Sequence, residues 1–409
     1  MHGNSGTCLS LTVNGTCSWS QARTTAVGTG GLILSGTASM VGPNGGQFGT
    51  LTVAGTMSVS VGANVNFGDI DITVTGVTTV SGLITISSTQ GGKTFSSIVI
   101  SAGGEIKCTS AETINVSGNV TMQGGNYDGT ATSRLNVGGN FVVQSGTNSM
   151  SRTRLTVTGT FSVAAVFNLN NANGSKTLND FVITSAGDFE CNVVESWTIN
   201  GNFQNDGIFT SNTGTYTFGG TSKTFSGAAV TTFDGTLSCN GTYTNNGYVS
   251  LNAATTLTSS LAGAGKWTQG SGTLEVGCTN ANFCVTNFSA SGAGNTVVYN
   301  RSTAQTVRNP TSSIYHHLTL AGSNTKSLST ATTCNGNLTI NSGSTFDVTT
   351  SNFALNVKGN WTNNGTFTQR TGTVTFNGTS NSALTGAIGT TFNNLAISNS
   401  AGVTLSTVS

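Results

Sequence analysis

The sequence predicts an all-β protein, a single parallel β-solenoid with about 20 to 21 residues per rung. The first observation is the stretch LTVTGTF at 155–161, where Leu155, Val157 and Phe161 share one parity and the threonines share the other. This period-2 alternation is typical of a half-buried strand. The second observation is that the pattern returns along the chain, as LTVNGTC (11–17), LTVAGTM (51–57), INVSGNV (114–120), LNVGGNF (135–141), WTINGNF (197–203), LSCNGTY (237–243) and LNVKGNW (355–361).

A glycine stands in the middle of each unit, and its spacing sets the period. Most intervals between successive glycines are close to one or two times about 20 or 21 residues, and a fixed period of this size is the signature of a solenoid. Over 409 residues it predicts roughly 20 rungs. The expected corner glycines are Gly15, Gly36, Gly55, Gly118, Gly139, Gly159, Gly201, Gly241, Gly336 and Gly359.

Other fold classes fit the sequence less well. No long window has apolar residues at helical spacing, and Gly, Thr, Ser and Val dominate. Sandwiches and barrels need hairpins with variable loops, whereas a constant period suits rungs stacked in parallel. With 2 Pro and no linker-like stretch, residues 1–409 are expected to form one continuous solenoid. Internal duplications relate 93–120 to 176–203 and 201–218 to 359–376.

Stacking of equal rungs predicts what each position does. Apolar residues that follow the Gly-Thr or Gly-Asn step should form an inward ladder, namely Val120, Phe141, Phe161, Phe203, Tyr243, Leu338 and Trp361. Outward positions should form an uncharged polar stripe, namely Thr12, Thr52, Thr73, Asn115, Asn136, Thr156, Thr198 and Asn356. Thr and Asn stack on themselves without the repulsion of like charges, which explains why only 7% of residues are charged. The sequences NDG (205–207), NNG (245–247) and NNG (363–365) are expected to supply positive-φ residues at tight turns.

The charge balance bears on partners and location. The net charge is +1, and the 14 Lys and Arg residues are scattered, so no basic face for a nucleic acid is predicted. No run of about 18 apolar residues exists, so no transmembrane segment is expected. The scarcity of charge and the eight cysteines favour an extracellular or cell-surface location.

Groups that carry chemistry are few, and most are explained structurally. His316 and His317 fall in a repeated turn, and the carboxylate pairs Asp69 with Asp71 and Asp188 with Glu190 lie on single strands. Such pairs are compatible with cation binding or sugar cleavage, but no dense cluster of acids and bases accompanies them. Arg152 and Arg154 form a basic pair without an acidic partner nearby in sequence. No catalytic residue, cofactor or metal site is therefore predicted.

The eight cysteines occupy different kinds of position. Cys17, Cys239 and Cys334 occupy apolar positions of the repeat, while Cys108 and Cys191 are equivalent across an 83-residue offset and too far apart to bond. The candidate disulfides are Cys278 with Cys284 and, second, Cys8 with Cys17, where Cys17 is also compatible with a core role.

The stretches GNTVVYNRSTAQTV (294–307), CNGNLTINSGSTF (334–346), GNWTNNGTFTQRTGTVTFNGTS (359–380) and TTFNNLAISNSAGVTL (390–405) resemble the repetitive β-strand-repeat proteins that bacteria export, among them adhesin-like passenger domains and surface fibres. The resemblance implies a fold and no catalytic residues. We therefore expect an extracellular structural or adhesive solenoid, a candidate self-assembling subunit of a surface filament or sheath, with copies of itself or cell-surface glycans as partners. The alternatives are a carbohydrate-active β-helix enzyme (a polysaccharide lyase or hydrolase) and, less favoured, an ice-binding solenoid.

Overall fold

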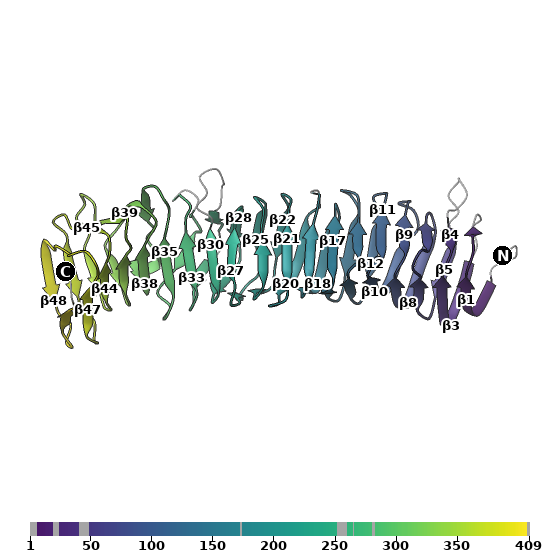
Figure 1. The fold of residues 1–409 in the computed structure, drawn as a ribbon, viewed down its shortest axis with the longest axis horizontal. Coiled ribbons are helices and arrows are strands. Elements are labelled where there is room, and N and C mark those ends of the chain that lie inside the picture. Colours follow the sequence, from purple (N-terminus) through teal and green to yellow (C-terminus); the bar gives the residue numbers. More distant parts are fainter. Residues whose placement is uncertain are drawn as a thin grey trace. The chain divides into compact units, whose positions relative to one another are not determined.

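The computed structural model describes residues 6–18, 24–40, 49–171, 174–251, 260–264, 266–279 and 283–406 (Figure 1). Within them every strand pairing is parallel, and the one helical element is the 3₁₀ turn η1 (Thr311–Ser313). The coils contain about 21 residues and number about 18. The predicted parallel β-solenoid is thus confirmed, with slightly fewer coils than expected because some coils are longer than 21 residues, such as the two 23-residue steps from Asn337 to Asn360 and from Asn360 to Ala383.

The chain divides into two compact units, unit 1 (Met1–Gly201 with Asp206–Asn212) and unit 2 (Asn202–Asn205 with Thr213–Ser409). In unit 1 most coils contribute two short strands, or one long bent strand, to a first sheet and one strand to a second sheet. Sheet 1A contains β1 (Gly6–Val13), β3 (Thr24–Leu34), β5 (Thr50–Val53), β6 (Met57–Val59), β8 (Asp71–Val80), β10 (Lys93–Ser101), β12 (Thr113–Val116), β13 (Val120–Gln123), β15 (Arg134–Val137), β16 (Phe141–Ser145), β18 (Arg154–Val163), β20 (Lys176–Ile183) and β22 (Ser196–Ile199). Sheet 1B contains β2 (Cys17–Ser18), β4 (Thr37–Met40), β7 (Asn64–Phe67), β9 (Leu83–Ile86), β11 (Glu105–Cys108), β14 (Asn126–Asp128), β17 (Thr147–Ser151), β19 (Val166–Leu169), β21 (Asp188–Cys191) and β24 (Ile208–Thr210).

Unit 2 has four sets of stacked strands. Sheet 2A contains β23 (Phe203–Asn205), β25 (Thr215–Phe218), β26 (Lys223–Ser226), β28 (Thr236–Cys239), β29 (Thr242–Asn245), β31 (Ser260–Ala262), β32 (Lys266–Gln269) and β34 (Asn287–Ser289). Sheet 2B contains β27 (Val230–Phe233), β30 (Tyr248–Leu251), β33 (Thr273–Val276), β35 (Thr296–Tyr299), β38 (His317–Leu320), β41 (Leu338–Ile340), β44 (Trp361–Asn363), β47 (Ser382–Thr385) and β49 (Val403–Leu405). Sheet 2C contains β37 (Ile314–Tyr315), β40 (Thr332–Cys334), β43 (Leu355–Val357), β46 (Thr373–Phe376) and β48 (Asn394–Ile397), and sheet 2D contains β36 (Gln305–Val307), β39 (Asn324–Leu328), β42 (Ser344–Asp347) and β45 (Thr366–Thr368).

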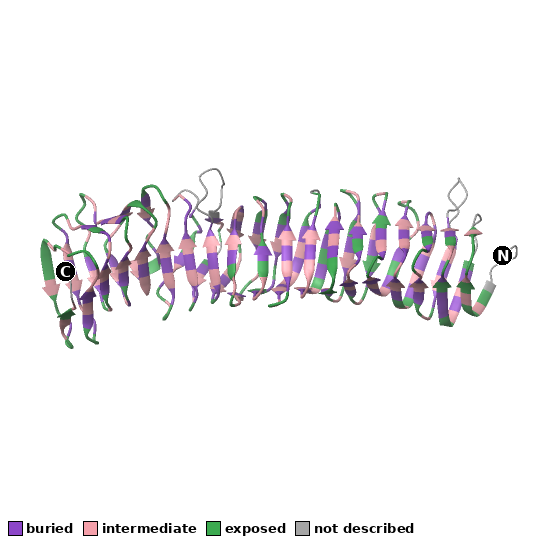
Figure 2. Ribbon diagram, viewed as in Figure 1, coloured by how far each residue is buried: buried purple, intermediate pink, exposed green. Residues whose placement is uncertain are grey.

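Identical side chains stack in register inside unit 1. Phe141, Phe161 and Phe181 are ladder partners on successive coils, with ring centroids 5.3 and 5.1 Å apart. Phe167 and Phe189 face them from sheet 1B. Each buried aromatic of this kind contributes about 2 to 3 kcal/mol through the apolar area removed from water. Figure 2 shows the resulting alternation of buried and more exposed positions along the strands.

All seven residues of the predicted inward ladder are buried. They do not form one column, however. Val120, Phe141 and Phe161 lie in sheet 1A, whereas Leu338 and Trp361 are stacked partners in sheet 2B. Tyr243 and Phe203 belong to sheet 2A.

The outer stripe needs a similar correction. Thr52, Thr73, Asn115, Asn136, Thr156 and Thr198 do belong to one column of sheet 1A, and Thr94 and Thr177 complete it. Thr12 instead pairs with Ile33, in the other half of that sheet. Asn356 lies on sheet 2C. Sequence similarity of the units therefore does not guarantee the same face.

The motif changes face within unit 2. Gly241 lies between β28 and β29, both in sheet 2A. Gly336 lies between β40 and β41, and Gly359 between β43 and β44, which places each between sheets 2C and 2B. In the first coils of unit 2 the chain therefore forms two strands of sheet 2A and then one strand of sheet 2B. In the later coils it forms one strand each of sheets 2B, 2D and 2C, in that order.

Candidate functional site

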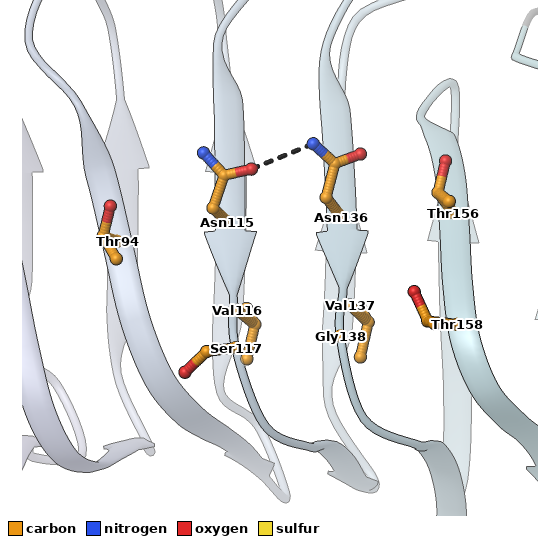
Figure 3. A pocket seen from close by; sticks show the side chains of 9 residues that line it. All are labelled: Thr94, Asn115, Val116, Ser117, Asn136, Val137, Gly138, Thr156 and Thr158. Atoms are coloured by element: carbon orange, nitrogen blue, oxygen red, sulfur yellow. Dashed lines mark hydrogen bonds between the residues drawn. The ribbon is translucent and has the colours of Figure 1, made fainter.

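A shallow trough runs across the outer face of sheet 1A, near the corner that joins the two sheet 1A strands of each coil. Its first hollow, of about 260 Å³, lies over Thr94, Asn115, Asn136 and Thr156 (Figure 3). A second hollow of about 330 Å³ shares Thr156 and extends to Thr177. The two hollows follow the column of the predicted outer stripe over successive coils, so this stripe lines a concave surface.

The lining of the trough is uncharged, and its Thr and Asn side chains lie beside the apolar Val116, Val137 and Leu178. Asn136 Nδ2 donates a hydrogen bond of 2.9 Å to Asn115 Oδ1, and Figure 3 shows the two amides side by side. In the described part of the chain the hydroxyl groups of Thr94, Thr156 and Thr158 make no side-chain hydrogen bond. They remain available to a ligand that carries hydroxyl groups.

The corner glycines beneath this trough are needed for close packing of coil on coil. A Cβ added at Gly159 would lie 2.6 Å from the carbonyl oxygen of Gly139, and one added at Gly36 would lie 2.3 Å from that of Gly15. None of the ten predicted corner glycines has a positive φ. The expectation for the NDG and NNG turns was wrong for the same reason: Gly207 and Gly365 are not at positive φ, and an added Cβ would collide with neighbouring carbonyl groups.

The residue after the corner glycine forms a second ladder that the sequence reasoning missed. The backbone N–H of Asn140 donates to Asn119 Oδ1, and that of Thr160 donates to Asn140 Oδ1, each at 2.8 Å. Ser97 Oγ accepts the corresponding bond from Asn119. Each side chain thus satisfies a backbone donor on the next coil. The recurrence of Asn after Gly was the available signal.

His317 occupies this ladder in unit 2. Its Nδ1 accepts a 2.9 Å hydrogen bond from the backbone N–H of Asn337, whose own Oδ1 accepts one from Asn360. His316 Nδ1 similarly accepts from Gly294 at 3.3 Å. Because Nδ1 accepts, the proton of each neutral ring is on Nε2, and no free nitrogen lone pair is left for a metal. Burial lowers the pKa of both rings, which favours this neutral form.

The two carboxylate pairs have different surroundings. Burial lowers the pKa of Lys93, and Asp71 and Asp69 lie close enough to that buried ammonium group to oppose this shift. Asp71 Oδ1 accepts a 2.5 Å hydrogen bond from the backbone of Gly92 on the next coil. Asp188 and Glu190 lie on the outer face of sheet 1B, where Glu190 is paired in the ladder with Asn168 and Thr210. In the described residues no three or more His, Cys, Asp or Glu side chains are grouped so as to hold a metal ion.

The structure holds all eight cysteines as free thiols, so neither candidate disulfide is formed. Cys8 and Cys17 are half-buried, Cys278 is buried and Cys284 is exposed. Burial raises the pKa of the Cys278 thiol to about 12, which makes that thiol unreactive at neutral pH.

Buried lysines were also missed. Lys93 Nζ donates to the carbonyl oxygens of Ile70, Gln90 and Gly91, and lies 3.9 Å from Glu112 Oε2. The signal was present, because a lysine stood at an inward position of the alternation, and the duplication repeats it.

The second pair, Lys176 with Glu195, is the equivalent of Lys93 with Glu112 after 83 residues, at 3.4 Å. Burial lowers the pKa of both lysines and the neighbouring carboxylates oppose this shift. A third, Lys326, is capped by the carbonyl groups of Arg301, Thr303 and Ser323 with no carboxylate, and burial lowers its pKa to about 8. These groups hold turns inside the coils.

No protein-family model, curated protein or solved structure matches the chain. Over the described residues, no helix has the length and apolar character needed to cross a bilayer.

Proposed function

We propose that the chain is an extracellular structural or adhesive β-solenoid that self-associates by stacking one coil on another. The supporting composition is the one given above: few charges and outer columns of Thr and Asn. The reactive side chains described above, namely the histidines, Asp71 and the buried lysines, form hydrogen bonds to neighbouring coils. Such a use of polar side chains suits a scaffold better than a catalyst.

The observation that carries the proposal is the surface of the coil that contains β48 and β49. Leu395 and Ile397 are ladder partners of the buried Val374 and Phe376, and Leu405 is the partner of Leu384. They occupy core positions, yet they are 46%, 57% and 75% exposed. Among the described residues, β48 pairs with β46 alone and β49 with β47 alone. Apolar side chains beside a strand edge form a template for a further strand, of the same chain or of another copy.

A second copy of the chain fits this template. In the described residues, the inward side chains Cys8, Leu11 and Val13 of its first coil are half-buried on β1, which pairs with β3. A head-to-tail contact of two different surfaces produces a filament when successive rotations do not close into a ring.

Electron microscopy and sedimentation of the purified protein at increasing concentration test the proposal. We expect rods that join end to end, and the double variant Leu395→Asp/Ile397→Asp should remain monomeric. The matched control is Ala396→Asp, an outward position on the same strand, which should still assemble. Monomers at all concentrations, or assembly that is indifferent to the double variant, would contradict end stacking.

A further inference from the structure

Two arginines are stacked on the edge of the trough. Arg134 and Arg154 are direct ladder partners on adjacent coils of sheet 1A, and both are exposed. Each lies two residues before a trough residue, Asn136 and Thr156, and therefore points from the same face of the strand. Adjacent strands are about 4.8 Å apart, so two like charges are held side by side.

No carboxylate of the described part of the chain compensates this pair. The three ion pairs between described residues involve other cations, namely Lys93, Lys176 and Arg370. In the column of Arg134 the neighbouring positions are Thr113 and, beyond Arg154, Ser175. The nearest acidic residue of that column, Asp71, is three coils away, about 14 Å, and already accepts a bond from Gly92.

Such a pair is unfavourable unless something else satisfies it. Like charges directly opposite each other on a sheet are destabilising, and the other ladder pairs given for the described strands contain none. Two guanidinium groups one rung apart match a carboxylate or sulfate, which accepts charge-assisted hydrogen bonds from both. The adjoining trough offers free hydroxyl groups and amides, with no aromatic ring on which a base could stack.

We propose that this surface binds an extended acidic polysaccharide. An anionic group of the polymer lies between Arg134 and Arg154, and hydroxyl groups of neighbouring sugars hydrogen-bond to Asn136, Thr156 and Thr158 in the trough. The inference rests on the adhesive part of the proposed function and names its ligand class. It is independent of end stacking, whose failure would appear in microscopy and leave polymer binding intact.

Binding of polygalacturonate to the full chain, measured by calorimetry at low and moderate salt, tests the arginine pair. The double variant Arg134→Gln/Arg154→Gln should weaken binding about tenfold or more, because it removes two charge-assisted contacts. The matched control Lys266→Gln/Lys358→Gln removes the same charge from exposed positions elsewhere and should leave the affinity within about twofold. Equal losses in the two double variants would mean attraction by net charge alone and would overturn the proposal.

A second variant tests the trough itself. Thr158→Trp fills the hollow and keeps both arginines, so it should reduce polygalacturonate binding; unchanged binding would overturn the role of the trough.

Neutral dextran should bind far more weakly than polygalacturonate. If dextran binds as well, the arginines do not select the ligand, and if an oligothymidylate strand binds more tightly than polygalacturonate, the surface recognises nucleic acid. Either result contradicts the assignment.

Discussion

The coils of sheet 1A and the coils built from sheets 2C and 2B use the same corner on different faces. In the first region Gly139 and Gly159 join two halves of one sheet, and in the second Gly336 and Gly359 join two separate sheets. In both, the glycine N–H donates to a glycine carbonyl of the preceding coil, at 3.0 Å for Gly159 and 3.1 Å for Gly359. The motif therefore specifies a corner and its stacking, and it does not specify which face of the solenoid follows.

The two regions differ in how they hold a buried cation. In unit 1 Lys93 and Lys176 each have a carboxylate within 4 Å, whereas Lys326 in sheet 2D has backbone carbonyl groups alone. They differ also in the ladder after the glycine, where His317 takes the place held by Ser97 in unit 1. Each difference can be tested by substitution.

The largest effect is expected at the corner glycines. Gly159→Ala and Gly359→Ala should each lower the free energy of unfolding by about 3 kcal/mol or more, because the new methyl group would lie within 2.7 Å of a glycine carbonyl group on the neighbouring coil. Gly15→Ala is the control, since a Cβ there meets nothing within 4 Å, and should change stability by less than about 0.5 kcal/mol. Urea unfolding provides the measurement. If Gly359→Ala leaves the unfolding free energy unchanged while Gly159→Ala lowers it, the two corners do not pack in the same way.

An intermediate effect is expected from pH at Lys326. Its pKa is about 8 in the folded protein, below its ordinary value of 10.5. Between these values the unfolded chain binds more protons, so this group makes the folded state more stable as pH rises through that window, and its cost is fully present below about pH 8. Between pH 7.5 and pH 10.5, the unfolding free energy of the wild type should rise by about 2 kcal/mol relative to that of Lys326→Met.

Lys93→Met is the matched comparison for that experiment. Glu112 opposes the effect of burial on the pKa of Lys93, so the shift toward wild type over the same pH range should be smaller. A larger pH dependence at Lys93 than at Lys326 would contradict the distinction between paired and unpaired lysines.

The smallest effect concerns the side chains that follow the corner glycine. Asn140→Ala and His317→Ala each leave one backbone N–H without its acceptor, which should cost about 1 kcal/mol. His317→Asn should restore most of the loss, because asparagine serves this role in the adjoining coils. At acid pH the protonated ring can no longer accept through Nδ1, so wild type should lose stability relative to His317→Asn. Thermal unfolding at two pH values measures both effects.

Much of the fold could be predicted from the sequence, because the alternation of apolar and polar residues and the length of the repeat can both be read from the residue order. The alternation around Leu155 and Phe161 fixed which side chains are buried, and the glycine spacing fixed the coil length. The change of face of the glycine motif within unit 2 could not be predicted, because a corner has the same sequence pattern on every face of the solenoid. It depends on how many strands separate one corner from the next, which is decided by the irregular segment around β34 and η1.

The candidate site was predicted less completely. Asn115, Asn136 and Thr156 were identified as an outer column, but the hollow above them also needs the residues of the neighbouring corner, such as Ser117 and Thr158, whose position depends on packing. The pairing of Arg134 with Arg154 needs the register of adjacent coils, and the sequence suggested Arg152 as the neighbour instead. Chemistry that is shared between coils becomes visible when those coils are aligned in space.

The rotation of the motif has a consequence for engineering. The segment pair 93–120 and 176–203 is separated by four coils, and in it β10 and β20 share sheet 1A while β11 and β21 share sheet 1B. The pair 201–218 and 359–376 has no such correspondence. Anyone who lengthens or shortens this solenoid should therefore cut and join whole coils. A graft that is one strand too long would still fold its corners, and would turn every downstream binding surface toward a different direction.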